Sequence, residues 1–358
     1  LRIVEALRTL GEIQIGYGEE MMNTIVLSMA SAPSDMLGLL LLAKILRLVD
    51  LQGKVSRVDI SPLFEMVDAL SRCGDTMARL YANPAYGAHL RLRGMKQEVM
   101  VGYSDSMKDG GIFASRWYLF RAQRELAAVS KAAGVTLTIF HGRGGSISRG
   151  GVPAYEAMRA LPAEVATGRV RLTEQGEVLS SKYFHFPVAL RETEQLVGGL
   201  LLAVASTPSE PDPSWTAAMN RMAAVGERAY RDLVYRDPAL ATYFEHATPI
   251  HEIAELNISS RPPSRKGTLS IRDLRAIPWV FAWMQNRHIL PGWYSLGSAL
   301  SSEPDRVLLN QMNRDWPFFA GLLEAGQQHA DVADVVLRIR LRDAQEQPPA
   351  GGFEDDAA

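Results

Sequence analysis

Two acidic side chains, Glu65 and Asp105, each follow a β-like segment and together could bind a metal ion. Glu65 ends the string Ser61-Pro62-Leu63-Phe64-Glu65, and Asp105 lies within Ser104-Asp105-Ser106-Met107-Lys108-Asp109. Mg²⁺ and Mn²⁺ are hard cations that keep several waters and accept one or two protein carboxylates. The same pattern is also typical of two solvated acids after strands, and the spacing alone leaves both interpretations open.

The glycine-rich segment 141–151 contains His141, Arg143 and Arg149. Glycines let a backbone approach a ligand closely, and forked guanidinium groups match the oxygens of phosphate or carboxylate. The glycine spacing fits neither a P-loop nor a dinucleotide fingerprint. The segment therefore favours an anion-binding loop over a flexible surface loop with solvated arginines. His141 could act as an acid, a base or a hydrogen-bond donor near neutral pH.

Three further cationic side chains are candidates for a substrate site, although composition does not distinguish them. Lys108 either brings a positive charge to a substrate or pairs at the surface with its neighbour Asp109. Arg261 precedes a proline, and Arg275 precedes an apolar, tryptophan-containing segment. We interpret the aromatic run 277–283 as core rather than as a ligand site.

Five short segments rich in Val, Ile, Leu, Tyr and Thr predict β-strands. They are Thr24–Met29, Val55–Ile60, Glu98–Tyr103, Val135–Phe140 and Arg169–Thr173. Helix-like segments separate them, and this alternation predicts βα units with a parallel sheet. In a (β/α)8 barrel the C-terminal strand ends share the face on which the active site is built. Five strands cannot close such a barrel, so we expect the chain to supply part of one.

The chain divides into three expected parts, and its predicted fold class is α/β with helix predominating. Residues 1–190 hold the βα units and the active-site loops, and residues 191–330 form a helical region that contributes active-site arginines. Residues 331–358 read as a disordered or divergent tail rich in Pro, Gly and acids. The clearest predicted helices are Phe113–Ala133, Glu192–Ala205, Ser214–Asp232, Arg275–Leu290 and Asp315–Ala325.

The composition excludes several classes of partner. The formal net charge is −2, so no bulk basic field favours nucleic acid or an anionic membrane. The longest apolar run, Met36–Ala43, is far short of the roughly 20 residues that a membrane-spanning helix needs. Cys73 is the only cysteine, so no internal disulfide can form and a cytoplasmic location is expected. We interpret Cys73 itself as a bystander.

Taken together, six strings resemble the phosphoenolpyruvate carboxylase family in order and spacing, over roughly Glu19 to Phe319. They are Leu63-Phe64-Glu65, Val101–Asp109, Phe140–Gly151, Thr173–Glu177, Ser260-Arg261-Pro262, and Arg275–Trp279 through Gln285-Asn286-Arg287. The resemblance implies a modified (β/α)8 barrel wrapped in helices and a homotetrameric full enzyme. It also implies that phosphoenolpyruvate and bicarbonate give oxaloacetate and phosphate, by way of carboxyphosphate and enolpyruvate.

The resemblance assigns roles to the candidate residues. Glu65 and Asp105 would hold Mg²⁺ or Mn²⁺. The substrate-site residues would be Lys108, His141, Arg143, Arg261 and Arg275. Arg149 would serve catalysis and also bind a dicarboxylate inhibitor such as aspartate or malate.

Departures from the family pattern predict that the isolated chain is inactive. A histidine motif of the Thr-Ala-His-Pro-Thr-Glu type, an upstream phosphate-binding arginine region and a Gln-Asn-Thr-Gly terminus are absent from the sequence. One alternative is therefore an inert fragment or a regulatory partner of the full enzyme. Another is a different phosphoenolpyruvate-using barrel enzyme, such as a kinase or phosphotransferase. That class would need a phosphohistidine segment or a nucleotide-binding domain, and neither pattern is visible.

Overall fold

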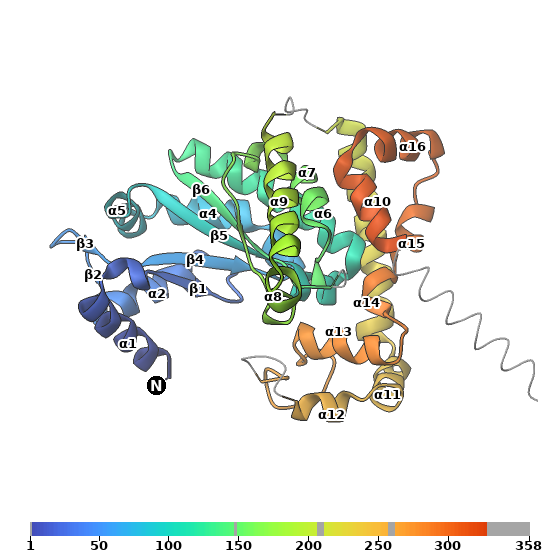
Figure 1. The fold of residues 1–358 in the computed structure, drawn as a ribbon, viewed down its shortest axis with the longest axis horizontal. Coiled ribbons are helices and arrows are strands. Elements are labelled where there is room, and N and C mark those ends of the chain that lie inside the picture. Colours follow the sequence, from blue (N-terminus) through green and yellow to red (C-terminus); the bar gives the residue numbers. More distant parts are fainter. Residues whose placement is uncertain (1, 147–148, 206–210, 257–261, 328–358) are drawn as a thin grey trace, which may run out of the picture.

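A parallel β-sheet forms the centre of the N-terminal half of the protein (Figure 1). The computed structural model describes residues 2–146, 149–205, 211–256 and 262–327. The sheet order is β1-β4-β5-β6-β7, and every neighbouring pair is parallel. The strands are β1 (Thr24–Leu27), β4 (Asp59–Phe64), β5 (Lys96–Gly102), β6 (Thr136–Gly142) and β7 (Arg171–Leu172). The predicted parallel sheet is therefore confirmed, and within the described residues it does not close into a barrel.

The second predicted strand was wrong in position. Residues 55–56 belong to β3 (Val55–Ser56), which pairs antiparallel with β2 (Val49–Asp50) outside the main sheet. The sheet strand is β4, which includes the Ser61-Pro62 pair that was expected to follow the strand. Proline is tolerated here because pairing with β5 begins only at Leu63, one residue after the missing N–H donor.

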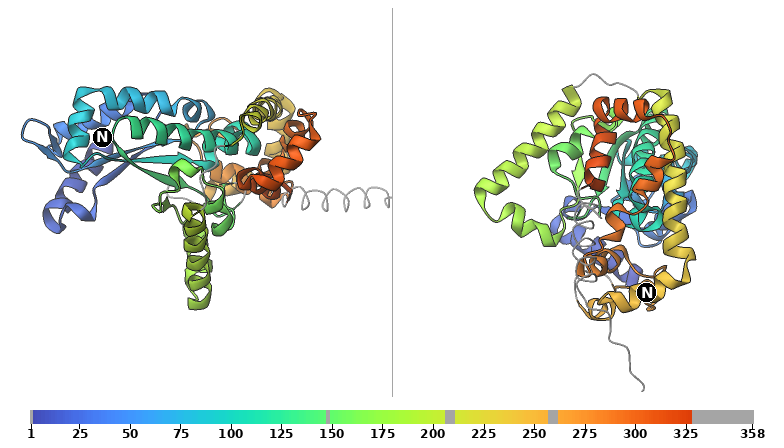
Figure 2. Two further views of the ribbon diagram at one scale, coloured as in Figure 1. Left: turned by 90° about the horizontal axis from the view of Figure 1, so that it is seen from above. Right: turned by 90° about the vertical axis from the view of Figure 1, so that its right-hand side faces the viewer.

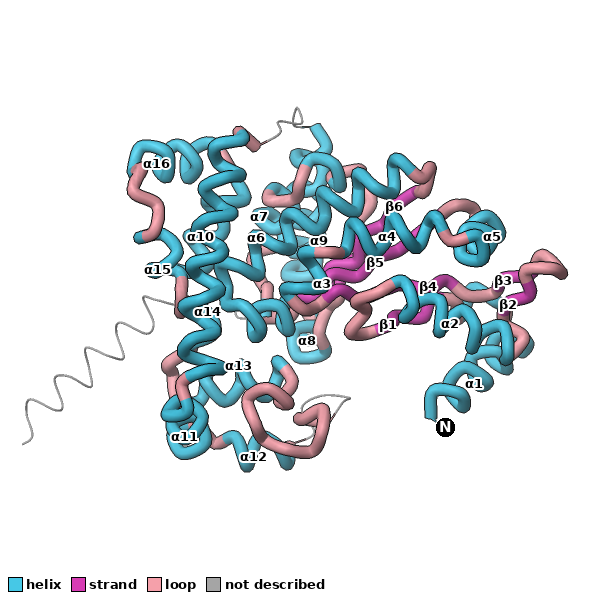
Figure 3. The backbone as a smooth tube through the Cα atoms, turned by 180° about the vertical axis from the view of Figure 1, so that it is seen from behind, coloured by secondary structure: helices cyan, strands magenta, loops and turns pink. Residues whose placement is uncertain are grey.

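Helices make up most of the rest of the described chain, as expected (Figure 3). Those before residue 206 are α1 (Arg2–Tyr17), α2 (Pro33–Ile45), α3 (Val67–Ser71), α4 (Cys73–Ala82), α5 (Pro84–Leu92), α6 (Tyr103–Ala132), α7 (Ala154–Arg159), α8 (Gly176–Tyr183) and α9 (Phe186–Ala205), with short turns η1 (Glu19–Met21) and η3 (Ala163–Val165). Figure 2 shows α9 projecting from the body of the molecule.

The later helices agree with the predictions in existence but not always in extent. They are α10 (Pro213–Arg231), the π-helical turn η4 (Asp232–Arg236), α11 (Pro238–Ala247), α12 (Ile250–Glu255), α13 (Ala276–Gln285), α14 (Leu290–Trp293), α15 (Leu296–Ser301) and α16 (Arg306–Asp315). The predicted helix Arg275–Leu290 ends early, because Arg287 and Ile289 adopt left-handed conformations with φ of 63° and 48°. After Trp316 the chain is helical again over residues 317–327.

Helix α6 begins earlier than predicted and contains a kink. The segment 104–109, expected to be a loop, forms the first turns of this helix directly after β5. The kink lies at Gly111, where φ is 81° and ψ is 168°. A Cβ atom there would lie 2.8 Å from Ser295 Oγ and 2.9 Å from the ring of Tyr230, so the position requires glycine.

Helix α6 also connects two hydrophobic cores. Leu119 and Leu126 pack with the sheet, whereas Phe113 and Trp117 pack with α10 and the last helices. A third core around the aromatic run of α13 contains Trp279 and Trp283, both fully buried, so the interpretation of this run as core is confirmed for the two tryptophans, whereas Ile277 and Phe281 of the same run line a cavity. None of the described helices is both long and apolar enough to cross a membrane. The predicted tail 331–358 lies outside the described residues.

Candidate functional site

A cavity of about 1010 Å³ opens at the C-terminal ends of β4, β5 and β6. It is also lined by the glycine-rich segment, the start of α8 and one side of α13. Its polar lining consists of Glu65, Tyr103, Ser104, Asp105, Ser146, Arg149, Gln175 and Arg275. Four of the candidate residues therefore converge on one cavity, as the rule for strand ends in parallel barrels predicts. We call it the large cavity.

Glu65 and Asp105 are held by contacts that fix their carboxylates at the wall of the large cavity. Glu65 follows β4, is buried, and its Oε1 accepts from the backbone N–H of Met29 at 3.0 Å. Asp105 lies in the first turn of α6, where its Oδ1 accepts from Arg265 Nη2 at 2.7 Å. Nothing in the sequence near Asp105 pointed to Arg265, which lies 160 residues away.

His141 and Arg143 meet at the hydroxyl group of Tyr103. The Tyr103 hydroxyl lies 2.9 Å from His141 Nδ1 and accepts from Arg143 Nη2 at 3.3 Å. The Arg143 guanidinium also lies over the Tyr103 ring, 4.8 Å from its centroid. Burial, and secondarily the charge of Arg143, lowers the pKa of His141 well below its usual range. His141 is therefore neutral at physiological pH and acts as a hydrogen-bonding group rather than as an imidazolium acid.

Sequence reasoning missed a second arginine beside Tyr103. Arg116, on α6, lies over the same ring at 5.7 Å. Its Nε and Nη2, and the Nε and Nη1 of Arg143, are buried without a hydrogen-bond partner in the described structure. Burial, and then the neighbouring Arg143, lowers the pKa of Arg116 to about 10. Two cations thus share a region whose donors are available to an anion.

Arg149 is packed against the first turn of α6. Its Nε donates to Ser104 Oγ at 3.3 Å, and its backbone carbonyl accepts from the N–H of Gly144 at 2.8 Å. Gly150, with φ of 89°, lies so close to Tyr103 that an added Cβ would come within 2.5 Å of it. This contact requires glycine and brings the segment onto the cavity wall.

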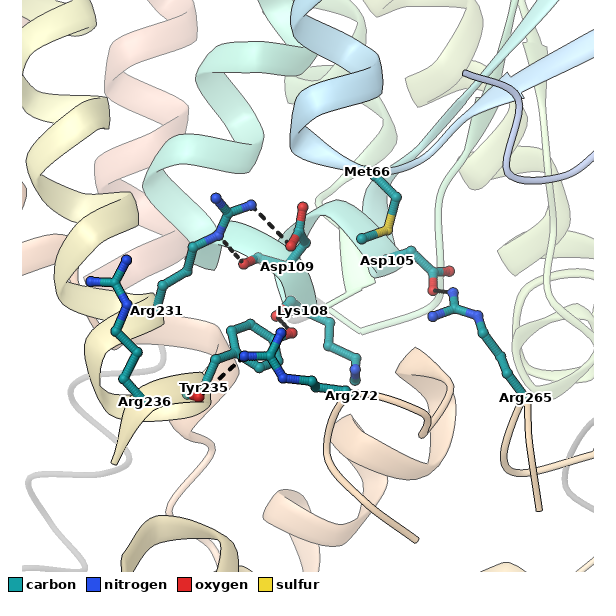
Figure 4. A pocket seen from close by; sticks show the side chains of 9 residues that line it. All are labelled: Met66, Asp105, Lys108, Asp109, Arg231, Tyr235, Arg236, Arg265 and Arg272. Atoms are coloured by element: carbon teal, nitrogen blue, oxygen red, sulfur yellow. Dashed lines mark hydrogen bonds and ion pairs between the residues drawn. The ribbon is translucent and has the colours of Figure 1, made fainter. Parts of the chain in front are cut away.

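Lys108 does not line the large cavity but a smaller neighbouring pocket of about 350 Å³ (Figure 4). We call this the arginine pocket; its lining is Met66, Asp105, Lys108, Asp109, Arg231, Tyr235, Arg236, Arg265 and Arg272. Lys108 is only 4% exposed, so the alternative of a surface residue is wrong. Burial lowers its pKa to about 8, although the negative charge of Asp105 opposes this change.

The residues around the kink of α6 bind this part of the helix to α10 and η4. The hydroxyl of Tyr235 donates to the Lys108 carbonyl at 2.7 Å, and Arg231 Nε donates to the Asp109 carbonyl at 3.2 Å. The Asp109 carboxylate pairs with Arg231 at 3.0 Å rather than with Lys108. These contacts satisfy carbonyl groups next to the kink, where regular helical bonding is interrupted.

The remaining candidates have simpler outcomes. Arg275 lies just before α13, lines the large cavity, and donates from Nε to the Pro262 carbonyl at 3.0 Å. Arg261 lies outside the described residues. Cys73 is fully buried, and burial raises the pKa of its thiol far above the usual range, which suits the interpretation of an inert residue.

Comparisons with known proteins identify the family of this chain. A family model described as phosphoenolpyruvate carboxylase matches residues 1–335. The chain belongs to the phosphoenolpyruvate carboxylase family. It is 44% identical over 325 residues to the phosphoenolpyruvate carboxylase of Azorhizobium caulinodans, covering 88% of this chain and 35% of that protein. The resemblance predicted from six short strings is therefore confirmed.

Two further phosphoenolpyruvate carboxylases show the same partial coverage. That of Roseiflexus castenholzii is 41% identical over 354 residues, covering 95% of this chain and 38% of its own length. That of Mycobacterium avium is 44% identical over 322 residues, covering 86% of this chain and 34% of its own length. The chain thus spans about a third of the length of the curated relatives it matches.

The donor set of this family member fits a hard divalent cation. Glu65 and Asp105 supply two carboxylates to one cavity. The described residues contain no group of three or more His, Cys, Asp or Glu side chains suited to a metal ion. A structural zinc site needs four protein ligands. Mg²⁺ and Mn²⁺ instead combine one or two carboxylates with water and substrate oxygens, so the two residues fit that class.

Proposed function

We propose that this chain is the part of a phosphoenolpyruvate carboxylase that carries most of the reaction site. The reaction joins bicarbonate to phosphoenolpyruvate and gives oxaloacetate and phosphate, which makes the enzyme a carboxy-lyase. The observation that carries the proposal is the convergence of Glu65, Asp105, Arg149 and Arg275 on one cavity at the strand ends. The match of residues 1–335 to the family supports it.

Glu65 and Asp105 would hold the divalent metal. When bound, Mg²⁺ or Mn²⁺ supplies a Lewis acid that stabilises negative charge on an enolate oxygen. The arginines contribute positive charge from fixed positions: Arg143 from the end of β6, and Arg275 from the start of α13. Preorganised donors of this kind stabilise charge that develops on a transferring phosphoryl group. Arg261 is assigned to the same group on family resemblance alone.

Tyr103 gives His141 and Arg143 a fixed relative position. Because its hydroxyl accepts from Arg143, its proton is directed to His141 Nδ1. His141 then keeps its own proton on Nε2, where it can donate a hydrogen bond without carrying a charge. The glycine-rich segment closes over the cavity in this proposal and excludes water, which would otherwise protonate the enolate.

Several properties of the whole enzyme belong to the same proposal. The division into parts 1–190, 191–330 and 331–358 remains our working description of the chain. The full enzyme is a cytoplasmic homotetramer, and a dicarboxylate such as aspartate or malate inhibits it through Arg149. The isolated chain, about a third of the length of its relatives, does not turn over by itself.

The test is bicarbonate-dependent formation of oxaloacetate, measured in a coupled assay. The 358-residue chain is assayed alone, and then within a chimera in which it replaces the matching segment of the Azorhizobium enzyme. We expect no turnover alone, activity in the chimera, and loss of that activity in chimeric Asp105→Asn. An inactive chimera that folds and assembles would instead support the inert fragment, and a chain that inhibits the intact relative would support the regulatory partner.

A further inference from the structure

The arginine pocket has a charge balance that its protein contacts do not neutralise. Five cationic side chains line it: Lys108 from α6, Arg231 from α10, Arg236 from η4, and Arg265 and Arg272 from the segment 262–275. Only two carboxylates, those of Asp105 and Asp109, line the same space. Figure 4 shows these side chains, brought from separate parts of the chain, around one space.

Two of the five cations are ion-paired within the lining, and the others are not. Arg231 pairs with Asp109 and also with Glu227, which is not part of the lining, and Arg265 pairs with Asp105. Arg236 pairs with Asp232, which is not part of the lining. The two remaining cations, Lys108 and Arg272, form no ion pair among the described residues.

Lys108 and Arg272 both lie against Tyr235. Lys108 Nζ is 5.8 Å from the centroid of the Tyr235 ring, and the Arg272 guanidinium is 5.2 Å from it. Arg272 Nη2 also donates to the Tyr235 carbonyl at 3.3 Å. Across the described residues neither cation has a carboxylate within ion-pairing distance. A buried ammonium group with no carboxylate in direct contact is costly, and an anion in the pocket would reduce that cost.

We propose that the arginine pocket is a second anion site, which binds a small dianionic oxyanion of the phosphate-monoester type. Guanidinium forks match the oxygens of such a group, and an ammonium group adds a point charge. The volume of about 350 Å³ lies at the low end of the roughly 300–1,000 Å³ typical of small-molecule sites. It therefore suits a compact ligand with a short carbon skeleton, or free phosphate, rather than a nucleotide.

Arg265 connects this site to the large cavity. It lines the arginine pocket, yet its Nη2 occupies Oδ1 of Asp105, which lines both spaces. An anion in the pocket offers Arg265 another partner and releases that carboxylate oxygen for a divalent cation. Anion and metal should therefore strengthen each other's binding, and the coupling must be reciprocal. This step, unlike the anion site itself, rests on the metal assignment in the proposed function.

The site is tested by titrating the purified 358-residue chain with sulfate, a tetrahedral dianion, and measuring binding by calorimetry. Arg272→Gln should weaken sulfate binding at least about tenfold, because it removes a charged donor. Arg272→Lys should recover part of the loss, since lysine keeps the charge but not the fork. Arg79→Gln, which changes an exposed arginine paired with Asp75 on α4, is the matched control and should bind like wild type.

The position of the bound sulfate is established with a second variant. Arg275→Gln removes a cation that lines the large cavity and does not line the arginine pocket, so it should leave sulfate binding at the arginine pocket intact. Unchanged affinity in folded Arg272→Gln, or loss of binding only in Arg275→Gln, would overturn the proposal. Glycerol 3-phosphate separates the two sources of the anion: tighter binding than sulfate assigns the site to a phosphorylated metabolite, and equal binding assigns it to free phosphate.

The coupling is tested by measuring Mn²⁺ affinity by electron paramagnetic resonance, with and without saturating sulfate. We expect sulfate to tighten Mn²⁺ binding several-fold in wild type and to have no such effect in Arg265→Gln. Equal tightening in both proteins would exclude Arg265 as the connection. A chain that binds sulfate but no Mn²⁺ would contradict the metal assignment and leave the anion site standing.

Discussion

The large cavity and the arginine pocket share Asp105 but differ in their position in the fold and in the charge of their linings. The large cavity lies at strand ends, combines acids with arginines, and has an apolar wall from α13. The arginine pocket lies between helices and is dominated by cations. In our proposals the large cavity binds a metal ion together with an organic substrate, whereas the arginine pocket binds an anion alone. One turn of α6 separates them, since Asp105 faces both and Lys108 faces only the pocket.

The difference shows how a single helical turn can serve two sites. The first segment of α6 is held at both ends. At its start, Ser106 Oγ donates to the Gly102 carbonyl at 2.7 Å, and across the kink the same oxygen lies 2.6 Å from Ser115 Oγ. At its end, Tyr235 and Arg231 bind the carbonyls next to the kink. A change that disturbs one site through this segment is therefore expected to reach the other.

The largest expected effect belongs to two arginines, Arg143 beside Tyr103 and Arg149 on the wall of the large cavity, measured in the chimera. Arg143 follows β6 directly and is stacked on Tyr103, so Arg143→Ala should reduce kcat by about 10²–10³. Arg143→Lys should recover part of this loss because it keeps the charge but not the fork. Arg149 lies in the glycine-rich segment, so Arg149→Ala should also blunt inhibition by aspartate. Identical effects of both alanine variants on kcat and on the inhibition constant would refute this division.

A second prediction concerns the carboxylates that define the large cavity. Glu65→Gln and Asp105→Asn should each weaken Mn²⁺ binding, because each removes a charged ligand. Loss of a residue that only hydrogen-bonds to a metal ligand typically weakens metal affinity roughly 10–100-fold, and loss of the ligand itself should weaken it at least as much. Asp105→Asn should in addition weaken the hold on Arg265. Asp75→Asn, which changes an exposed acid on α4, is the control. Wild-type Mn²⁺ affinity in both variants would show that the metal lies elsewhere.

The sequence predicted the features of the two sites that depend on the residue pattern of single segments. The parallel sheet and most helices follow from apolar periodicity, and the convergence of Glu65 with Asp105 follows from the geometry of parallel strand ends. The predicted strand at 55–60 was misplaced because Ser61-Pro62 was expected to follow the strand, whereas both residues lie inside β4 and pairing with β5 begins after the proline.

What the sequence could not predict depends on contacts between distant segments. The position of Lys108 in the arginine pocket depends on Tyr235 and Arg272, which lie far along the chain. The pairing of Arg265 with Asp105 likewise joins two segments that are far apart in the sequence. Tyr103 was read as the last residue of a strand, and only its contacts with His141 and Arg143 reveal its position at the site.

The charge imbalance of the arginine pocket makes a prediction about pH. Burial lowers the pKa of Lys108 from 10.5 to about 8, so between these values the unfolded chain binds a proton that the folded chain lacks. The free energy of unfolding should therefore rise with pH across this window. Lys108→Met should remove that rise and add on the order of 1–3 kcal/mol at pH 7.

Lys131→Met, on the exposed end of the same helix, is the control for this experiment. The measurement is urea unfolding at pH 7, 8, 9 and 10, with each variant compared to wild type at every pH. A difference between Lys108→Met and wild type that stays constant over the series would contradict a buried, partly neutral lysine. Sulfate should shrink the difference, because an anion in the pocket stabilises the charged ammonium group.

The smallest expected effect tests whether unpaired positive charge is confined to the arginine pocket. Arg116 lies behind the large cavity, and two of its guanidinium nitrogens are buried without a partner in the described structure. Arg116→Met should therefore raise the free energy of unfolding by about 1 kcal/mol, because it removes donors that cost free energy to bury. Arg121→Met on the same helix removes an arginine that is paired with Glu125, and should lower stability by about 0.3–0.5 kcal/mol. If Arg116→Met is instead destabilising and also lowers kcat of the chimera, Arg116 acts with Arg143 as an anion-binding arginine beside Tyr103. Unpaired cations would then be present near both sites, and the large cavity and the arginine pocket would differ only in their acidic residues.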